Sequence, residues 1–166
     1  MTSSSINNSP RAGFIRRFGS WVYDVLLSFA VYMVAGAIAF LLFNILIKFG
    51  VISMAGFDHA IDLKRSSLVY RLLVDGFGLF WIAFFFVWFW SRSGQTLGMK
   101  AWRLRVQNQD GTRISKTTAI ARLLPTLLGL GNLIVLFDKK NKLSLQDRMT
   151  DTEVVVLSLE ENKGRL

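Results

Sequence analysis

The sequence predicts an all-α integral membrane protein with two long transmembrane helices, a third, interrupted helical segment and a small cytoplasmic β element. Three observations lead to this fold class. Hydrophobic residues make up 52% of the 166 residues and charged residues only 19%, which is more apolar than a soluble domain of this length requires. Two apolar runs are long enough to cross a bilayer. Basic residues flank both runs, as is typical of membrane-spanning helices.

The two ends of the chain differ from its apolar body. Residues 1–10 are rich in Ser and Asn and show no apolar periodicity, so we expect a disordered cytoplasmic tail there. Residues 158–166 are expected to form a polar C-terminal tail. The membrane domain is therefore predicted between these tails, at residues 11–157.

The first span is predicted at residues 18–47 and the second at residues 72–90. Asp24 is the one charged residue in the first run, and Asp75 is the one charged residue in the second. A helix of about 20 residues is enough to cross a hydrocarbon core about 30 Å thick. A cleaved signal peptide is disfavoured for the first run, because apolar residues continue well past the small residues at 35–37 that resemble a cleavage site.

Basic residues set the expected topology. Arg11, Arg16 and Arg17 precede the first span, and residues 91–118 carry six basic residues and one acidic residue. Cytoplasmic segments of membrane proteins are enriched in Lys and Arg, so we assign the N-terminus and residues 91–118 to the cytoplasm. We therefore expect a multi-pass protein of a bacterial-type cytoplasmic (inner) membrane.

The third apolar segment, residues 119–137, contains residues that interrupt a lipid-facing helix: Arg122, Pro125, Gly129, Gly131 and Asn132. A single crossing would place the basic residues after it outside, contrary to the charge rule. The flanking runs at 102–107 and 153–157 have strand-like patterns. If these strands pair, both flanks lie on one side, and the segment either re-enters the membrane or lies in its interface. A third crossing is the alternative.

Arg17 and Asp24 are the first candidates for a functional role. Their spacing of seven residues is close to two helical turns and places both on one helix face, about 10 Å apart. Arg17 can reach the headgroups, whereas Asp24 needs a partner inside the membrane. Three interpretations of Asp24 stay open: a hydrogen-bonded structural anchor, a salt-bridge partner for a base such as Arg122, or a carboxylate that exchanges cations or protons.

Two further acidic residues can be given expected partners. Asp75 lies four residues after Arg71, so an i, i+4 ion pair is predicted. Asp147 lies in a polar turn before the valine-rich run at 154–156. It is expected to cap a backbone turn or, alternatively, to face Arg122 and close a cytoplasmic polar cluster.

Composition argues against several kinds of site. The chain has no cysteine and one histidine, His59, so thiolate and histidine-cluster metal sites are not expected, and neither is a cofactor. No nucleophile or acid–base constellation indicates an enzyme. The net charge of +9 is concentrated beside the apolar runs, which favours the lipid bilayer over nucleic acid as the partner of these bases.

Several short motifs follow one another in a defined order: residues 17–24, Gly94, Thr96, Gly98, residues 104–106, Asp110, Gly111, Arg122, Asp147, Thr152 and residues 154–156. Together they resemble the RDD family of membrane proteins, which is named for one arginine and two aspartates. The resemblance covers residues 11–156 and implies that Arg17, Asp24 and Asp147 occupy the three name positions. Ser20 and Met99 depart from the family pattern. The resemblance also implies a role in transport, since some members resemble cation/proton antiporters.

Two functional hypotheses follow. In the first, the protein takes part in cation/proton transport: Asp24 exchanges Na⁺, Li⁺, K⁺ or H⁺, and Arg17 and Asp147 tune it from the cytoplasmic side. Two or three membrane segments do not readily enclose a pathway, so this hypothesis predicts a homo-oligomer, most simply a two-fold dimer. In the second, the protein is a non-transporting accessory or scaffold protein, and Arg17, Asp24, Arg122 and Asp147 form a static polar core.

Overall fold

The computed structural model describes residues 9–138 and 140–163 and divides into two compact units. Unit 1 comprises Met1–Leu27 and Phe85–Leu166, and unit 2 comprises Ser28–Phe84. Residues 1–8 of the predicted N-terminal tail and residues 164–166 of the predicted C-terminal tail lie outside the described residues.

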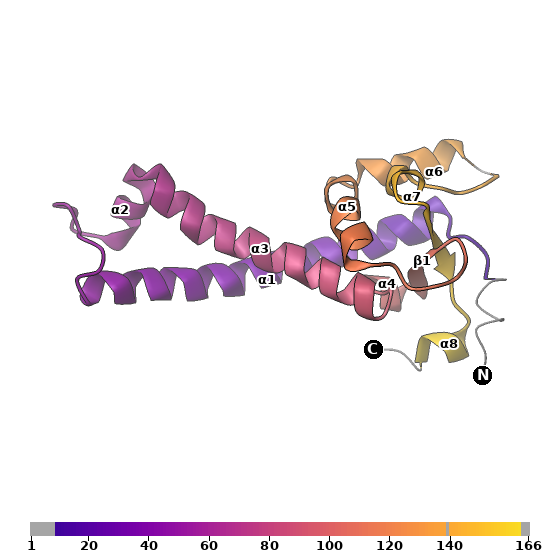
Figure 1. The fold of residues 1–166 in the computed structure, drawn as a ribbon, viewed down its shortest axis with the longest axis horizontal. Coiled ribbons are helices and arrows are strands. Elements are labelled where there is room, and N and C mark those ends of the chain that lie inside the picture. Colours follow the sequence, from indigo (N-terminus) through magenta and orange to yellow (C-terminus); the bar gives the residue numbers. More distant parts are fainter. Residues whose placement is uncertain (1–8, 139, 164–166) are drawn as a thin grey trace. The chain divides into compact units, whose positions relative to one another are not determined.

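The elements follow one another along the chain as drawn in Figure 1: α1 (Phe14–Lys48), α2 (Ala60–Ser66), α3 (Leu68–Arg92), α4 (Leu97–Ala101), β1 (Leu104–Asn108), α5 (Lys116–Leu127), the 3₁₀ helix η2 (Leu130–Leu133), α6 (Ile134–Phe137), α7 (Leu145–Met149), β2 (Thr152–Val156) and α8 (Leu159–Lys163).

The two apolar runs predicted to span the membrane lie in the helices α1 and α3, which are long and apolar enough to cross one. Both helices extend beyond the apolar runs at 18–47 and 72–90, and α1 includes Arg16 and Arg17 in its first turns. Polar residues at either end can continue the backbone hydrogen bonds of a helix, so each helix is longer than its apolar run. The predicted fold class, an all-α membrane protein with a small β element, is confirmed.

Unit 2 is held by a small apolar cluster of Ala39, Phe43, Leu63 and Val74. Beside it, Lys64 Nζ forms an ion pair of 2.6 Å with Asp75 Oδ1. Arg71, one turn earlier on α3, was the predicted partner of Asp75, and this prediction is wrong. The i, i+4 rule considers a single helix, whereas folding brings a cation from α2 to this carboxylate.

Unit 1 contains a two-stranded antiparallel sheet, in which the strand-like runs at 102–107 and 153–157 pair with each other. Leu104 pairs with Val156 at one end of the register, and Asn108 pairs with Thr152 at the other. The N-terminal segment lies along β2: Ala12 N donates to Val154 O at 2.8 Å, and Val156 N donates to Pro10 O at 2.9 Å. Pro10, the last residue of the predicted tail, is therefore joined to the sheet.

The third apolar segment forms a bent pair of helices. The axis turns by 81° between α5 and the η2–α6 stretch. The turn is at Gly129, which has φ +70°, a left-handed conformation that glycine adopts without a steric penalty. Because β1 precedes this pair, β2 follows it, and the two strands are partners, both flanks of the segment return to the same sheet.

Helix α5 has one polar and one apolar face, but the polar face is buried and the apolar face is exposed, the reverse of a surface helix in a soluble protein. Ser115 caps its N-terminus by accepting a hydrogen bond from Thr118 N. Its polar Arg122 is buried, whereas Ile120 is 57% and Leu124 is 74% exposed. A helix that turns its polar face inward and its apolar face outward is suited to contact with lipid.

Helix α8 is tied to the rest of unit 1 through Asn162. Gln95 Nε2 donates to Asn162 Oδ1 at 2.9 Å, and Asn162 Nδ2 donates to Lys100 O at 3.0 Å. Helix α8 therefore occupies part of the segment 158–166 that was expected to be a polar tail.

Candidate functional site

Arg17 of α1, Arg122 of α5 and Asp147 of α7 form a buried ionic cluster, which we call the Arg/Asp core. Arg17 Nη1 lies 2.6 Å from Asp147 Oδ2, and Arg122 Nη2 lies 2.8 Å from Asp147 Oδ1. All three side chains are buried. Each oxygen of one carboxylate thus faces a different guanidinium, and Asp147 joins three elements that are far apart in the sequence.

The local sequence orients Asp147. Ser144 is the N-cap of α7 and forms a capping box with Asp147: Ser144 N donates to Asp147 Oδ2 at 3.1 Å, and Asp147 N donates to Ser144 Oγ at 3.4 Å. A capping box of this kind satisfies N–H groups that the start of a helix leaves free. Both alternatives open for Asp147 are therefore realised, because it caps a turn and also faces Arg122.

The guanidinium of Arg17 is almost fully engaged. Besides its ion pair, Nε donates to Ala12 O at 3.0 Å, Nη2 donates to Lys142 O at 2.9 Å, and Nη1 donates to Ser144 Oγ at 3.2 Å. A buried ion pair offsets the cost of desolvation only when such additional hydrogen bonds are present. These contacts hold the start of α1 against the segment that precedes α7.

Arg122 bridges α5 to the turn between α7 and β2. Its Nη1 donates to Thr150 Oγ1 at 3.3 Å and makes a closer contact with Thr152 Oγ1. Its Nη2 is occupied by Asp147. The arginine that interrupts the third apolar segment is therefore turned into unit 1, where it shares the carboxylate of Asp147 with Arg17.

The environment of Asp147 favours its ionised form. Burial alone would raise its pKa, but the guanidiniums of Arg17 and Arg122 and the hydrogen bond from Ser144 N more than offset burial, and the pKa of Asp147 lies below its ordinary value of 3.8. The Arg/Asp core is accordingly an ionic cluster near neutral pH.

Asp24 of α1 has a separate set of donors. Thr96 Oγ1 donates to Asp24 Oδ2 at 2.6 Å, and Gly98 N donates to Asp24 Oδ1 at 3.0 Å. Thr96 also caps α4 by accepting from Met99 N at 3.1 Å. Of the three interpretations of Asp24, this geometry is that of a hydrogen-bonded anchor, and the expected partner Arg122 is engaged by Asp147 instead.

The approach of α4 to Asp24 requires glycine at position 98. A Cβ atom on Gly98 would lie 2.6 Å from both Asp24 Oδ1 and Ser20 O, closer than Cβ atoms approach in proteins. The family resemblance included Thr96 and Gly98 among its motif residues but assigned neither of them a role. The threonine three residues before Met99 is an N-cap signal that could have located the start of α4.

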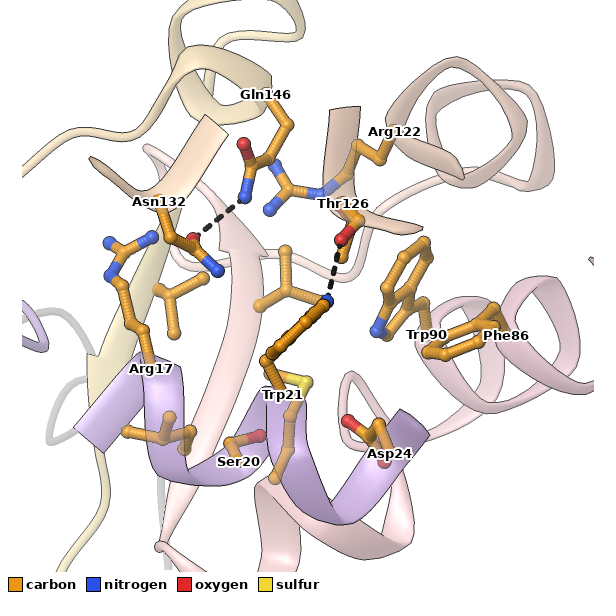
Figure 2. A pocket seen from close by; sticks show the side chains of 14 residues that line it. Arg17, Ser20, Trp21, Asp24, Phe86, Trp90, Arg122, Thr126, Asn132 and Gln146 are labelled. Carbon is orange, nitrogen blue, oxygen red and sulfur yellow. Dashed lines mark hydrogen bonds between the residues drawn. The ribbon is translucent and has the colours of Figure 1, made fainter. Parts of the chain in front are cut away.

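A small cavity lies between the Arg/Asp core and Asp24 (Figure 2). Its volume is about 50 Å³, and both Asp24 and Arg122 line it. On its wall Trp21 Nε1 donates to Thr126 O at 3.1 Å, and Gln146 Nε2 donates to Asn132 Oδ1 at 2.9 Å. The cavity therefore brings together polar groups from α1, α5, η2 and α7.

The four predicted site residues thus fall into two groups. Arg17, Arg122 and Asp147 are in direct contact, whereas Asp24 reaches the same cavity with its own donors. Sequence reasoning missed Ser144 and Gln146, which become important only when α7 folds against the other elements. Among residues 9–138 and 140–163, no group of three or more His, Cys, Asp or Glu side chains is placed to hold a metal ion.

A model described as the RDD family matches residues 11–151, a range that includes all four predicted site residues. Neither the curated proteins nor the solved structures gave a match.

Replacement of Asp147 tests the energetic weight of the Arg/Asp core. Asp147→Asn is expected to lower the free energy of unfolding by about 3–5 kcal/mol, because it leaves two buried guanidiniums without a counter-charge. The change can be followed by tryptophan fluorescence during denaturant unfolding in detergent. Asp138→Asn is the control, since Asp138 pairs with the exposed Arg148 and should cost much less. Equal losses in the two variants would contradict this account.

The acid dependence of stability tests the ionisation of Asp147. The pKa of Asp147 is lower in the folded chain than its ordinary value of 3.8, so its stabilising contribution is complete above that pH and is lost as the pH falls toward the folded-state value. The difference in unfolding free energy between the wild type and Asp147→Asn should therefore shrink below pH 3.8. A difference that stays constant through this range would show that the ionic form of Asp147 is not what stabilises unit 1.

Proposed function

This chain belongs to the RDD family, and from that premise we propose that it is a non-transporting accessory protein of the membrane into which it is integrated. One observation carries the proposal: both carboxylate oxygens of Asp24 and both of Asp147 accept hydrogen bonds from donors of the same chain. The acids that were candidates for ion exchange are thereby engaged in holding elements together.

A carboxylate that carries ions must release its partners in every cycle. For Asp147 this would mean separating a buried charge from two guanidiniums, at a cost of about 3–5 kcal/mol if one partner is lost. For Asp24 it would mean breaking the hydrogen bonds from Thr96 Oγ1 and Gly98 N, which hold α4 against α1. Both requirements favour a static polar core.

A rigid unit of this kind suits the recognition of another protein through side chains. The edges of the sheet are already covered by the chain itself: Ala12 N donates to Val154 O, and Val106 N donates to Gly94 O, each at 2.8 Å. A partner therefore has no free run of β backbone to extend as an added strand. The proposed contact is with the surface side chains of unit 1.

The proposal includes a location and a topology. The chain is placed in a bacterial-type cytoplasmic membrane as a multi-pass protein, with its N-terminus and residues 91–118 in the cytoplasm, because these segments carry the excess of Lys and Arg. Residues 119–137 are proposed to enter the membrane from the cytoplasmic side and return. The outward apolar face of α5 and the pairing of β1 with β2 support this arrangement.

A second candidate function is cation/proton transport, and it is favoured by a different observation. Asp24 lines the cavity of about 50 Å³, which is where an exchanging carboxylate would meet Na⁺, Li⁺, K⁺ or H⁺. Two spans and one bent pair do not readily enclose a path, so this candidate requires a homo-oligomer.

Proton flux in liposomes separates the two functions. The purified protein should give no cation-driven change of internal pH beyond that of protein-free liposomes when Na⁺, Li⁺ or K⁺ is added, because its acids are held by internal donors. Asp24→Asn should leave this result unchanged. The matched control is Asp75→Asn, which alters the acid of the other span without touching the cavity. Flux that is present in the wild type, lost in folded Asp24→Asn and kept in Asp75→Asn would establish transport instead.

Labelling of single cysteines tests the topology. Because the chain has no cysteine of its own, a thiol reagent can label only the cysteine that is introduced. Gln109, Ser158 and Ser53 are exposed and suit replacement by cysteine. A membrane-impermeant thiol reagent should reach Gln109→Cys and Ser158→Cys from the cytoplasmic side and Ser53→Cys from the opposite side. If Gln109→Cys and Ser158→Cys react from opposite sides, the segment between them crosses the membrane and the re-entrant arrangement is wrong.

A further inference from the structure

An open groove of unit 1 lies between the start of α1 and the second half of the bent pair, and we call it the Arg16/Lys142 groove. It is lined by residues 13–16, by residues 135–136 of α6 and by Lys142, and its volume is about 460 Å³. Sites for small organic ligands occupy about 300–1,000 Å³. The groove shares no lining residue with the cavity beside Asp24, so it is a separate candidate site.

The groove carries positive charge that the protein does not balance. Arg16 and Lys142 line it, and the described residues of its lining include no acid. The nearby bases Arg17 and Arg148 each have a carboxylate partner. By contrast, the guanidinium of Arg16 makes one long hydrogen bond, from Nη1 to Trp102 O at 3.4 Å, and neither Arg16 nor Lys142 is paired with a carboxylate in the part of the chain that the structure describes. Two such cations at one groove suit an anionic ligand.

The Arg/Asp core fixes the backbone from which each of these two bases extends. Lys142 N donates to Asp138 O at 2.8 Å, and Lys142 O accepts from Arg17 Nη2 at 2.9 Å. Arg16 is the residue next to Arg17 in α1. The two backbones are thus held in place while the side chains stay available, an arrangement that lowers the entropy lost when a ligand binds.

The remaining wall of the groove is apolar and faces outward. Ile15 is 77% exposed and Leu136 is 45% exposed. Arg16 lies two residues before the apolar run that begins at residue 18, which is about 3 Å along the helix axis. The groove therefore lies at the end of the first span, where lipid headgroups meet hydrocarbon.

This combination of charge and apolar surface defines the occupant. A soluble anion such as inorganic phosphate would leave Ile15 and Leu136 exposed to water. A zwitterionic lipid would bring a cation of its own beside Arg16 and Lys142. A phospholipid with a negatively charged headgroup matches both parts of the groove, because its phosphate can contact the bases while its acyl chain covers the apolar wall.

We propose that the Arg16/Lys142 groove binds one anionic phospholipid of the surrounding membrane. Arg16 and Lys142 hold its phosphate, and Ile15 and Leu136 contact the start of an acyl chain. The bound lipid then joins the first turn of α1 to α6. This inference goes beyond the proposed function, and it holds for an accessory protein as well as for a transporter.

Native mass spectrometry of the purified chain in a neutral detergent tests the site, because it counts the lipids bound to each protein. The probes are phosphatidylglycerol and phosphatidylcholine with identical acyl chains. The first phosphatidylglycerol should bind at a concentration about tenfold lower than the first phosphatidylcholine, since only its headgroup has a net negative charge. Equal binding of the two lipids would overturn the proposal.

Two pairs of substitutions locate the site. Arg16→Gln combined with Lys142→Gln should weaken phosphatidylglycerol binding by about 10–30-fold, because both bases of the groove are lost. Arg113→Gln combined with Lys163→Gln is the matched control: it removes the same charge from exposed residues that do not line the groove. Equal losses in the two pairs would show that net charge alone attracts the lipid and would overturn the proposal.

A single substitution replaces the first pair if that pair does not fold. Only main-chain atoms of Lys142 take part in the hydrogen bonds described above, so Lys142→Gln keeps the contacts that hold the segment before α7. It should weaken phosphatidylglycerol binding by about fivefold. Unchanged affinity in this variant would overturn the proposal.

A soluble competitor distinguishes a lipid from a free phosphate compound. Glycerol phosphate has the phosphate of the lipid but no acyl chain, so about a tenfold excess over phosphatidylglycerol should leave the lipid bound. Displacement of the lipid would assign the groove to a soluble anion and overturn the proposal. None of these results depends on the liposome flux assay, so this inference and the proposed function fail separately.

Discussion

The carboxylate of Asp147, buried between Arg17 and Arg122, is the interaction on which the rest of unit 1 depends. It joins the start of a membrane helix, the first half of the bent pair and the turn before β2. None of these charges could be buried alone, because an isolated ion in a medium of low polarity costs several kcal/mol. The three elements must therefore meet. The capping box with Ser144 holds the Asp147 carboxylate in one orientation, which sets the sides from which the two arginines approach it.

Asp24 provides a second anchor of a different kind. Its donors are a hydroxyl and a backbone amide, and the carboxylate brings α4 against α1 through the gap that Gly98 leaves. On α5 the usual arrangement of a helix in a soluble domain is reversed, since Arg122 lies inside while Ile120 and Leu124 lie outside. That reversal is expected where lipid surrounds the protein.

These two anchors explain why the acids of an apolar chain are better suited to structure than to exchange. Each is bound by groups that also cap a short helix, Ser144 for α7 and Thr96 for α4. Releasing Asp147 would break its ion pairs and its capping box, and releasing Asp24 would break the hydrogen bonds that hold α4 against α1.

The sequence by itself determined the membrane character, the two long apolar helices, the two strand-like runs, and the family resemblance that singled out Arg17, Asp24 and Asp147. These features depend on local composition and on short motifs. Only the tertiary structure decided which charges meet: Asp75 with Lys64 rather than Arg71, Asp147 with two arginines at once, and Asp24 with Thr96 and Gly98. The physical reason is that helical spacing specifies neighbours within one element, whereas a buried charge takes the partners that folding brings from 72 or 130 residues away.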